Sequence, residues 1–464
     1  MTEKQNFWHP NKLNYLPFQK EGIAFLEKRK GRAIIGDEPG LGKTIQVLGY
    51  IANNPDIKKV LVVCPATLKY NWYNETRKWL PANANTVAVL ESKKVNLLYK
   101  ETRVHIINYD IVSAWKEVLV NHKFDLLVLD EAHYLKNPTA KRTKAIKFLS
   151  KKIKKIIPLT GTPAVNRPIE LYNAISLVAP TLFPSYFQYA HRYCNAHHNG
   201  FGWDFSGSCR EEELHTKLAN IMIRRKKEDV LDELPDKRYS YIPFKLNKNC
   251  EYYKADKDFL NWIKETKGNK AVKTVSQAIF LTKITYLRKL AVEAVLEDSI
   301  AWIKDFLETG EKIIVFAIHK DIISILQNEF KKKCVVVDGS TSLTNRQKAV
   351  TDFQNKKEIT VFIGNIQAAG VGITLTAAST VVFLELPWTP GELEQASDRC
   401  HRIGQKNAVN IYYLLGQDTI EEKLAQIIDS KRKVLSKIID GKTYDDENTF
   451  DTLIKNYINE RKGK

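Results

Sequence analysis

The sequence lacks the long apolar runs that would insert a chain into a membrane. No stretch of the 464 residues approaches the roughly 18 uninterrupted apolar residues of a transmembrane helix. The first residues, "MTEKQNFWHPNKLNYLPF", also lack the apolar core of a secretory signal. We therefore expect a soluble, intracellular protein with no membrane partner. It would lie in the cytoplasm or nucleoid if the source is bacterial or viral, and in the nucleus if it is eukaryotic.

Cysteine is scarce, and its spacing is that of neither a disulfide framework nor a zinc site. The six cysteines lie at positions 64, 194, 209, 250, 334 and 400, and none forms a C-x-x-C pair. In a chain of this length they are typical of reduced, structural thiols. Three histidines at 191, 197 and 198 lie near Cys194 and Cys209, but the spacing matches no standard zinc pattern. We expect no structural zinc.

Low-complexity tracts are absent, and the charge is strongly one-sided. Lysine and arginine number 72 against 53 aspartates and glutamates, giving a net charge of +19. This excess favours a polyanionic partner, through counterion release at phosphates, but a lysine-rich solvated surface accounts for it equally well. The basic clusters, "EKRKGR", "KKIKK", "RRKK", "KKK" and "SKRK", are dispersed along the chain, which favours a broad folded surface over a basic tail.

What the sequence does contain is one strand pattern, repeated in two halves. Short β-branched runs typical of buried parallel strands alternate with helical patterns. In the first half they are "RAIIG", "KKVLVVCP", "VHIINY", "FDLLVLDEAH" and "KKIIPLTGTP", and in the second "EKIIVFAIH", "KCVVVDGST", "EITVFIGN", "STVVFLELPW" and "AVNIYYLLG". Between about 170 and 300 the patterns are helical. The predicted fold is α/β, with two doubly wound parallel-sheet lobes separated by helical insertions.

A phosphate-binding loop follows the first predicted strand. The stretch "GDEPGLGKT", residues 36–44, fits G-x-x-x-x-G-K-[ST] except that Asp37 stands where the first glycine belongs. Gly40 and Gly42 allow the backbone to approach phosphates closely. Lys43 can reach the β and γ phosphates, and Thr44 can bind Mg²⁺. The residues therefore predict a nucleotide site at the start of a helix.

An acidic pair supplies the rest of the hydrolytic chemistry. The apolar run "LLVLDEAH" ends in Asp130 and Glu131, where ligands bind in open α/β sheets. Asp130 can hold the magnesium, and Glu131 can polarise the attacking water. Either motif alone could be accidental, for example a strand-ending acidic turn. Both in one lobe, in this order, predict nucleotide hydrolysis.

Four motifs together carry a family resemblance. "DEPGLGKT", "DEAH", "LTGTP" and "QASDRCHRIGQ" resemble the motor motifs of the Swi/Snf-like ATPases of helicase superfamily two. The resemblance implies two RecA-like lobes, ATP and Mg²⁺ as cofactors, and DNA as partner. Asp37 is common in that family, whereas Pro39 stands where it usually has methionine and removes one N–H donor. The implied ATP-binding residues are Gln19, Asp37, Glu38, Pro39, Gly40, Leu41, Gly42, Lys43 and Thr44. Gln19 is implied as the adenine contact, although an ordinary surface glutamine is the alternative.

The resemblance also implies DNA contacts and catalytic residues in the second lobe. The implied DNA contacts are Thr67, Trp72, Asn137, Thr160, Gly370 and Thr374. From the residues alone, Trp72 could equally belong to the core and Thr160 could cap a turn. Gln395, Arg399 and Arg402 complete the catalytic set with Lys43, Asp130 and Glu131. The two arginines are three apart, on one face if helical. They resemble arginine fingers, with a surface ion-pair cluster as the alternative, and the ATP is expected between the lobes.

The same resemblance divides the chain into six parts. They are a first RecA-like lobe (1–175), a helical protrusion (176–235), a linker (236–248), a second helical protrusion (249–300), a second RecA-like lobe (301–425) and a C-terminal helical bracing segment (426–464).

Two stretches, "RYCNAHHNGFGWDFSGS" and "GITLTAASTVVFLELPWTPGELEQASDRCHRIGQ", are most similar to the annealing-helicase, fork-remodelling branch. The expected function is a DNA-dependent ATPase that translocates on double-stranded DNA and remodels forks or branched DNA, by branch migration, fork regression or strand annealing. The alternatives are a translocase that displaces DNA-bound proteins such as a stalled polymerase, and a catalytically silent DNA-binding module. The complete acid, lysine and arginine set argues against the last. Protein partners are not readable from the sequence.

Overall fold

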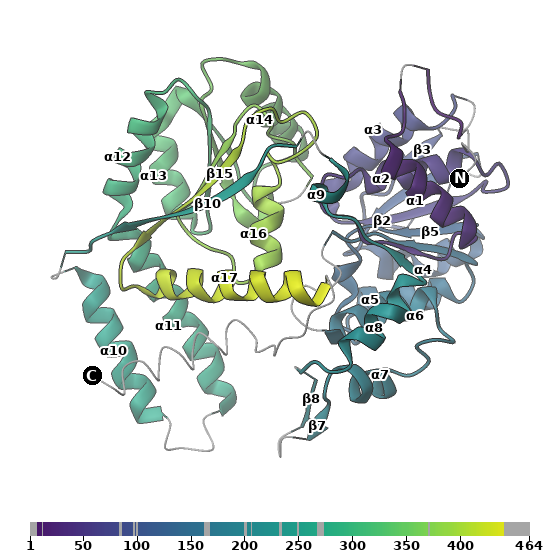
Figure 1. Cartoon of the computed structure of the whole chain (residues 1–464), viewed down its shortest axis with the longest axis horizontal. Coiled ribbons are helices and arrows are strands. Elements are labelled where there is room, and N and C mark those ends of the chain that lie inside the picture. Colours follow the sequence, from purple (N-terminus) through teal and green to yellow (C-terminus); the bar gives the residue numbers. More distant parts are fainter. Residues whose placement is uncertain are drawn as a thin grey trace. The chain divides into compact units, whose positions relative to one another are not determined.

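The computed structural model describes residues 7–11, 13–82, 86–95, 98, 101–161, 168–198, 202–205, 207–231, 234–247, 250–266, 273–369 and 372–439 (Figure 1). The chain divides into two compact units, the first built mainly from Met1–Glu233 and the second mainly from Leu234–Lys433. Within the described ranges, no helix has the length and apolar character needed to cross a membrane.

The first unit is built on a parallel sheet. In folds of this kind, ligands bind at the carboxyl ends of the strands. In spatial order the strands are β3 (Val87–Val89), β4 (Val104–Asn108), β2 (Val60–Cys64), β5 (Leu126–Leu129) and β6 (Lys155–Pro158). Two bridges, Arg32 with Ile156 and Ile35 with Leu159, continue this order to β1 (Ile34–Ile35). A further strand, β9 (Met222–Ile223), pairs in parallel with β1. The buried strands explain the continuous apolar runs of the sequence.

Helices cover this sheet and extend it. Before the acidic pair come α1 (Pro17–Lys28), α2 (Lys43–Ala52), the short η1 (Ala66–Leu68) and α3 (Lys69–Trp79). A buried cluster joins one face of the sheet to α4 (Val112–Asn121) and α5 (Lys141–Ser150), and η2 (Ala132–Leu135) lies between them in sequence. A separate cluster packs the insertion around Ile34. Its elements are η3 (Pro168–Leu171), α6 (Tyr172–Val178), α7 (Tyr186–Tyr193) and α8 (Glu211–Ala219). A small hairpin, β7 (His197–His198) with β8 (Trp203–Asp204), follows α7, and α9 (Lys227–Val230) ends the unit.

The second unit has a six-stranded parallel sheet. Its order is β10 (Lys237–Phe244), β15 (Val409–Gly416), β14 (Thr380–Phe383), β11 (Ile313–Ala317), β13 (Val361–Asn365) and β12 (Cys334–Val337). One face packs on α12 (Leu296–Leu307) and α13 (Lys320–Phe330), which η5 (Lys331–Lys333) follows. The other packs on α14 (Leu343–Asn355), α15 (Ile366–Ala369), α16 (Pro390–Ser397) and α17 (Ile420–Ile439). The long α10 (Glu251–Thr266) and α11 (Lys273–Glu293) share a smaller core with α17.

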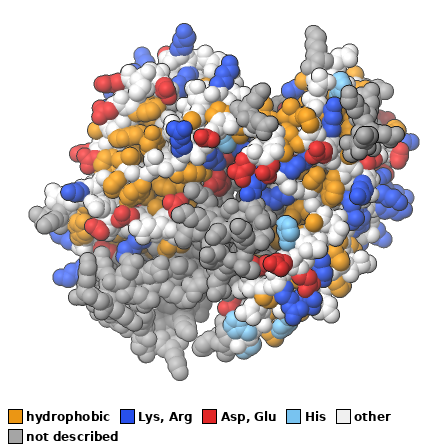
Figure 2. All heavy atoms as spheres, in the orientation of Figure 1, with side chains coloured by type: hydrophobic (Ala, Val, Ile, Leu, Met, Phe, Trp, Pro, Cys, Tyr) orange, Lys and Arg blue, Asp and Glu red, His pale blue; other side chains and the backbone are white. Residues whose placement is uncertain are grey.

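The predicted α/β class with two parallel sheets is confirmed, and all ten apolar runs named from the sequence form strands. Strands β3, β7, β8, β9 and β10 lie outside those ten runs. Residues 237–244, expected within a linker, form β10, which pairs with β15 along its whole length. The surface is charged in patches. On the face shown in Figure 2, lysine and arginine side chains occur in separate groups interspersed with acidic ones.

Candidate nucleotide site and arginine turn

The phosphate loop lies between β1 and α2, and its glycines are required by geometry. Gly42 caps the N-terminus of α2 with a left-handed backbone (φ 75°), and Gly40 also has a positive φ of 96°. A Cβ on Gly42 would stand 2.5 Å from Nε2 of Gln19. Helix α2 therefore presents its N-terminus, with the partial positive charge of its dipole, at the end of this loop.

Lys43 lies folded against the loop that precedes it. Its Nζ donates to the backbone oxygens of Asp37 at 2.8 Å and Glu38 at 3.3 Å. Burial lowers the pKa of Lys43, opposed by the negative charges of Glu131, Asp37 and Asp130. The lysine and the acidic pair therefore lie within electrostatic range of each other, as the two sequence motifs predict.

Asp130 is buried at the end of β5 and held by aromatic residues. Its Oδ2 accepts a 2.7 Å hydrogen bond from Nε1 of Trp72, and its Oδ1 accepts one from the backbone N–H of Glu131 at 2.9 Å. Tyr109 donates to its backbone oxygen at 2.9 Å. Burial and the neighbouring Glu131 raise the pKa of Asp130 to about 6, while Trp72 and Lys43 oppose the rise. The carboxylate is thus fixed in place beside a cation.

Glu131 occupies an unusual backbone conformation. Its φ of 50° lies in the left-handed region, which costs a non-glycine residue about 1–3 kcal/mol and occurs often at functional sites. Its Oε2 lies 3.3 Å from Nδ1 of His133. The turn into η2 therefore holds Glu131 in a geometry that a relaxed strand end would not give.

Gln19 joins the first helix to the phosphate loop. It is buried, its Oε1 accepts from the backbone N–H of Leu16 at 3.0 Å, and its Nε2 donates to the Leu41 oxygen at 3.3 Å. An ordinary surface glutamine is excluded by this burial. The side chain lies where it supports the loop, and its contact with adenine stays a prediction.

The residue that looked like a fault in the phosphate loop is one half of a buried ion pair. Asp37 has no exposed surface, and its carboxylate accepts hydrogen bonds from Arg225 at 2.6 and 3.1 Å and from Gln46 at 2.8 Å. The backbone N–H of Lys227 donates to Oε2 of Glu38 at 2.9 Å. The carboxylates of Asp37 and Glu38 thus face protein groups in this structure, and the basic run "RRKK" is not simply a solvated face.

The residues of the first unit that were predicted to contact DNA differ in how exposed their side chains are. Thr67 is half-buried in η1, and Asn137 is exposed, with its Oδ1 accepting from Thr139 at 2.8 and 2.9 Å. Thr160 is buried, and its backbone N–H donates to Ile35. Trp72 is fully buried, so in this structure its indole has no surface to offer DNA and belongs to the support of Asp130. Pro39 packs at the loop, where a Cβ on Gly161 would meet its Cγ at 2.8 Å.

The predicted catalytic residues of the second unit lie around the end of α16. Gln395 is buried within the helix, but α16 ends at Ser397, so Arg399 and Arg402 lie in the turn that follows rather than on one helical face. Arg399 is buried, and its Nε donates to the Gln395 oxygen at 2.7 Å. Arg402 is half-buried, and its Nη1 donates to Oγ1 of Thr374 at 3.1 Å. Gly370 lies outside the described residues.

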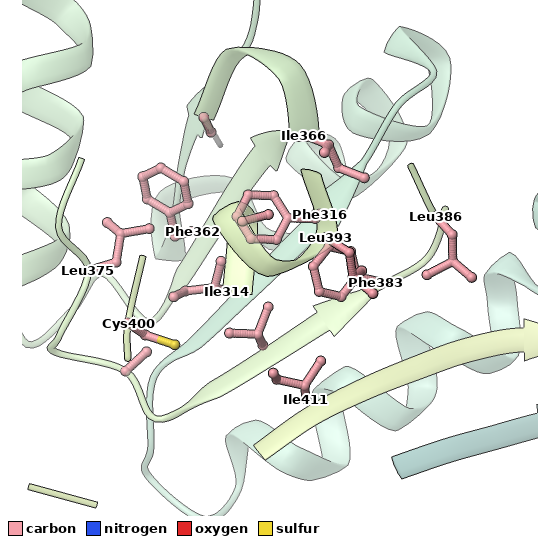
Figure 3. Close-up of a cluster of buried hydrophobic side chains, with 14 of the residues drawn as sticks. Ile314, Phe316, Phe362, Ile366, Leu375, Phe383, Leu386, Leu393, Cys400 and Ile411 are labelled. Carbon is pink, nitrogen blue, oxygen red and sulfur yellow. The ribbon is translucent and has the colours of Figure 1, made fainter. Parts of the chain in front are cut away.

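Cys400 anchors this arginine turn, residues 398–402, in the core of the second unit. Figure 3 shows its sulfur among the buried side chains of the sheet, near Ile314 and Leu375. Because Arg399 and Arg402 flank a buried residue, their guanidinium groups start from a fixed backbone. Elsewhere, the described residues contain no cluster of three or more histidine, cysteine or acidic side chains suited to a metal ion.

Comparison with known protein families identifies the family to which these motifs belong. The SNF2-related domain matches residues 18–294, more than half of the chain, and the helicase conserved C-terminal domain matches residues 298–404. The chain belongs to the SNF2-related family. The match confirms the resemblance to Swi/Snf-like ATPases that the motor motifs indicated.

Individual SNF2-related proteins are similar to nearly all of this chain. The human DNA annealing helicase and endonuclease ZRANB3 is 36% identical over 444 residues, which are 92% of this chain and 40% of the human protein. The SWI/SNF-related matrix-associated actin-dependent regulator of chromatin subfamily A-like protein 1 of Xenopus laevis is 38% identical over 91% of this chain and 44% of the frog protein. The SWI2/SNF2 ATPase core of Sulfolobus solfataricus in complex with double-stranded DNA matches 94% of this chain and 96% of that one, at 25% identity and a TM-score of 0.46. The chain therefore spans less than half the length of these two curated relatives.

Proposed function

We propose that this SNF2-related chain is a DNA-dependent ATPase that translocates on double-stranded DNA and remodels forks or branched DNA. The observation that carries the proposal is the first unit's site. A glycine-capped helix with Lys43 at its start lies within electrostatic range of the buried Asp130 and the half-buried Glu131 at the end of β5. This combination supplies cation, backbone donors and carboxylates for phosphoryl transfer.

Magnesium fits the donor set of this site. The Thr44 hydroxyl and the Asp130 carboxylate are hard oxygen donors, and Mg²⁺ is usually held by one or two such groups together with substrate phosphates. When bound, Mg²⁺ neutralises charge that develops on the β and γ phosphates. Trp72 keeps the Asp130 carboxylate oriented through its 2.7 Å hydrogen bond.

The roles of the other residues follow from their chemistry. Lys43 leaves the loop oxygens and contacts the β and γ phosphates, and Glu131 orients the water that attacks the γ-phosphorus. The new bond joins the water oxygen to phosphorus as the bond to the β–γ bridging oxygen breaks, and ADP leaves. We assign charge stabilisation on the γ-phosphate to Arg402, with Arg399 in support, when the lobes close during turnover. Gln19 reads adenine from its position against the loop.

DNA is proposed as a partner held mainly at phosphates. The net charge of +19 supports binding without base reading. We assign contacts to Thr67, Asn137 and Thr374, which keep some exposed surface, while Thr160 acts from within the core. The name of the human relative, a DNA annealing helicase, supports the fork-remodelling branch over simple translocation.

One assay separates the fork-remodelling proposal from its main alternative. ATP hydrolysis is measured with single strands, plain duplexes, forks and four-way junctions of equal nucleotide content. We expect the largest stimulation by forks or junctions, and conversion of a labelled fork into its regressed product. Equal stimulation by plain duplex, with displacement of a DNA-bound protein but no regressed product, would instead identify a protein-displacing translocase.

A further inference from the structure

Residues 221–225, which come late in the first unit, are hydrogen-bonded through their backbone to β1 and to the phosphate loop. Backbone hydrogen bonds run from Ile34 to Ile221 at 2.8 Å, from Gly36 to Ile223 at 2.7 Å and from Glu38 to Arg225 at 3.1 Å. Strand β9 thus pairs with β1, and backbone hydrogen bonds continue beyond this pair into the phosphate loop. A shift of these residues would move the loop backbone directly.

We call Arg224, Arg225 and Lys227 the first anchor. Side chains add further hydrogen bonds to those that its backbone makes. The guanidinium of Arg225 makes charged hydrogen bonds to Asp37, contacts the Phe18 oxygen and donates to Gln46 at 2.8 Å. Arg224 donates to the Gly36 oxygen at 2.7 Å. A planar guanidinium that binds a carboxylate through two nitrogens fixes direction as well as distance.

A second anchor, consisting of Pro235, Lys237 and Tyr239, begins where the chain enters the second unit. Nζ of Lys237 lies 2.7 Å from carboxylate oxygens of both Glu394 and Asp398, and Tyr239 donates to Glu394 at 2.7 Å. The Pro235 oxygen lies 2.8 Å from Nε2 of His401.

These contacts hold the arginine turn as well as the end of α16. Asp398 accepts through its backbone oxygen from Nε of Arg402 at 3.0 Å, so Lys237 and Arg402 bind the same residue. The turn that carries the proposed arginine finger is therefore tied to the strand that follows the unit boundary.

We propose that the two anchors form a coupling segment, in which Arg225 positions the phosphate loop and Lys237 positions the arginine turn. Each anchor lies within its own unit, and in the sequence the boundary between the two units, after residue 233, lies between the two anchors. A change at the phosphate loop is then carried by a short covalent path to the residues that stabilise the transition state. The inference rests on the proposed ATPase function and adds two positioning residues, Arg225 and Lys237, to the site residues predicted from the sequence.

The rival interpretation is that both ion pairs only stabilise their own units. It predicts that damage to the two anchors acts independently, since residues without shared partners give additive free energies. Coupling predicts that the second substitution adds little once the first anchor is broken. A double-mutant cycle across the two units therefore separates the two interpretations.

The cycle uses Arg225→Lys, which keeps the charge but loses the planar fork, and Lys237→Met, which removes the charge but keeps the chain length. Arg192→Lys is the matched control in the first unit, because Arg192 binds Glu213 through two nitrogens at 2.7 and 2.8 Å without touching the phosphate loop. Lys356→Met, at the surface pair with Asp352, is the control in the second unit. Unfolding temperature and duplex affinity are measured for every variant, and Asp37→Asn replaces Arg225→Lys if that variant does not fold.

We expect Arg225→Lys to raise the KM for ATP about tenfold. Lys237→Met should lower the DNA-stimulated kcat about tenfold while raising the KM for ATP by a smaller factor. A tenfold change is the scale of one hydrogen bond to a charged group. Lys237→Arg should recover most of the rate, and the controls should match the unaltered chain. In kcat/KM, the double variant should resemble the worse single variant. Losses that multiply would overturn the coupling.

The same measurements keep the proposed function separate. If the unaltered chain hydrolyses no ATP, with or without DNA, the proposed function fails. The double-mutant cycle is then measured with the affinity for a fluorescent ATP analogue in place of the catalytic constants. Arg225→Lys should still lower that affinity, and Lys237→Met should change it less in the Arg225→Lys background than alone. Independent effects on affinity would overturn the coupling in that case as well.

Discussion

Replacing Trp72 with phenylalanine tests how the first unit holds its magnesium ligand. The change removes the 2.7 Å hydrogen bond from Nε1 to Asp130 and keeps an aromatic ring in the core. A hydrogen bond to a charged group contributes about 1.5–3 kcal/mol. At about 1.4 kcal/mol per tenfold, this predicts a loss of about 10- to 150-fold in catalytic efficiency at limiting Mg²⁺. The assay is a Mg²⁺ titration of DNA-stimulated ATP hydrolysis.

The pH dependence gives this prediction a second signature. The Trp72 bond opposes the rise in the pKa of Asp130, which lies at about 6. Without the bond that pKa rises further, so protons compete with Mg²⁺ at a higher pH. The Mg²⁺ requirement of the variant should therefore exceed that of the unaltered chain more near pH 6.5 than near pH 8, where the carboxyl is ionised in both.

The matched control is Trp115→Phe. Trp115 is also buried, and its Nε1 donates to the Ser92 oxygen at 2.8 Å, so the same volume and one indole hydrogen bond are lost away from Asp130. Both variants should lose thermal stability, but only Trp72→Phe should change the Mg²⁺ dependence. Indistinguishable titrations of the two variants would refute the supporting role of Trp72.

Three further predictions concern the remaining parts of the motor. Arg402→Ala should lower the rate of single-turnover ATP hydrolysis at saturating DNA about 10³-fold, the usual cost of removing an arginine finger, while the affinities for ATP and DNA stay unchanged. A near-normal rate would instead support the alternative that Arg402 belongs to a surface ion-pair cluster. The affinity for duplex DNA should fall steeply as salt rises and vary little with base sequence, and a flat salt response in a fluorescence titration would contradict phosphate-dominated binding. Gln19→Ala should narrow the preference for ATP over GTP, measured as the ratio of kcat/KM values, and an unchanged ratio would reduce Gln19 to its contacts with Leu16 and Leu41.

The strands that the sequence predicted are those whose apolar runs are continuous. Most of them are buried on both faces of a parallel sheet, so their pattern depends on no distant partner. Two of the strands that the sequence did not reveal, β10 and β9, are of another kind. Strand β10 reads "KRYSYIPF", with exposed and half-buried residues in turn, because it lies at the sheet edge and contains a proline. Strand β9 has only two residues and exists because β1 lies beside it.

Site residues were also predictable where a local motif defines them, and not where their role depends on a residue distant in the sequence. The phosphate loop and the acidic pair were found because each is a contiguous motif with its own chemistry. Arg225 was read as part of a charged run, since its burial depends on Asp37, 188 positions earlier in the chain. Trp72 bonds a carboxylate 58 positions away, a contact that only the folded sheet creates. Arg399 and Arg402 would share a face only in a helix, and that condition is not met, because α16 ends before them.

The most direct test of the central claim is the rate of ATP hydrolysis by the purified chain, with and without forked DNA, compared with Lys43→Ala and Glu131→Gln. We expect clear stimulation by DNA in the unaltered chain. We expect no hydrolysis in either variant, with the fold intact in both and ATP binding retained in Glu131→Gln. An unaltered chain whose rate does not respond to DNA, or a Glu131→Gln variant that hydrolyses ATP at the normal rate, would contradict the proposed DNA-dependent ATPase function.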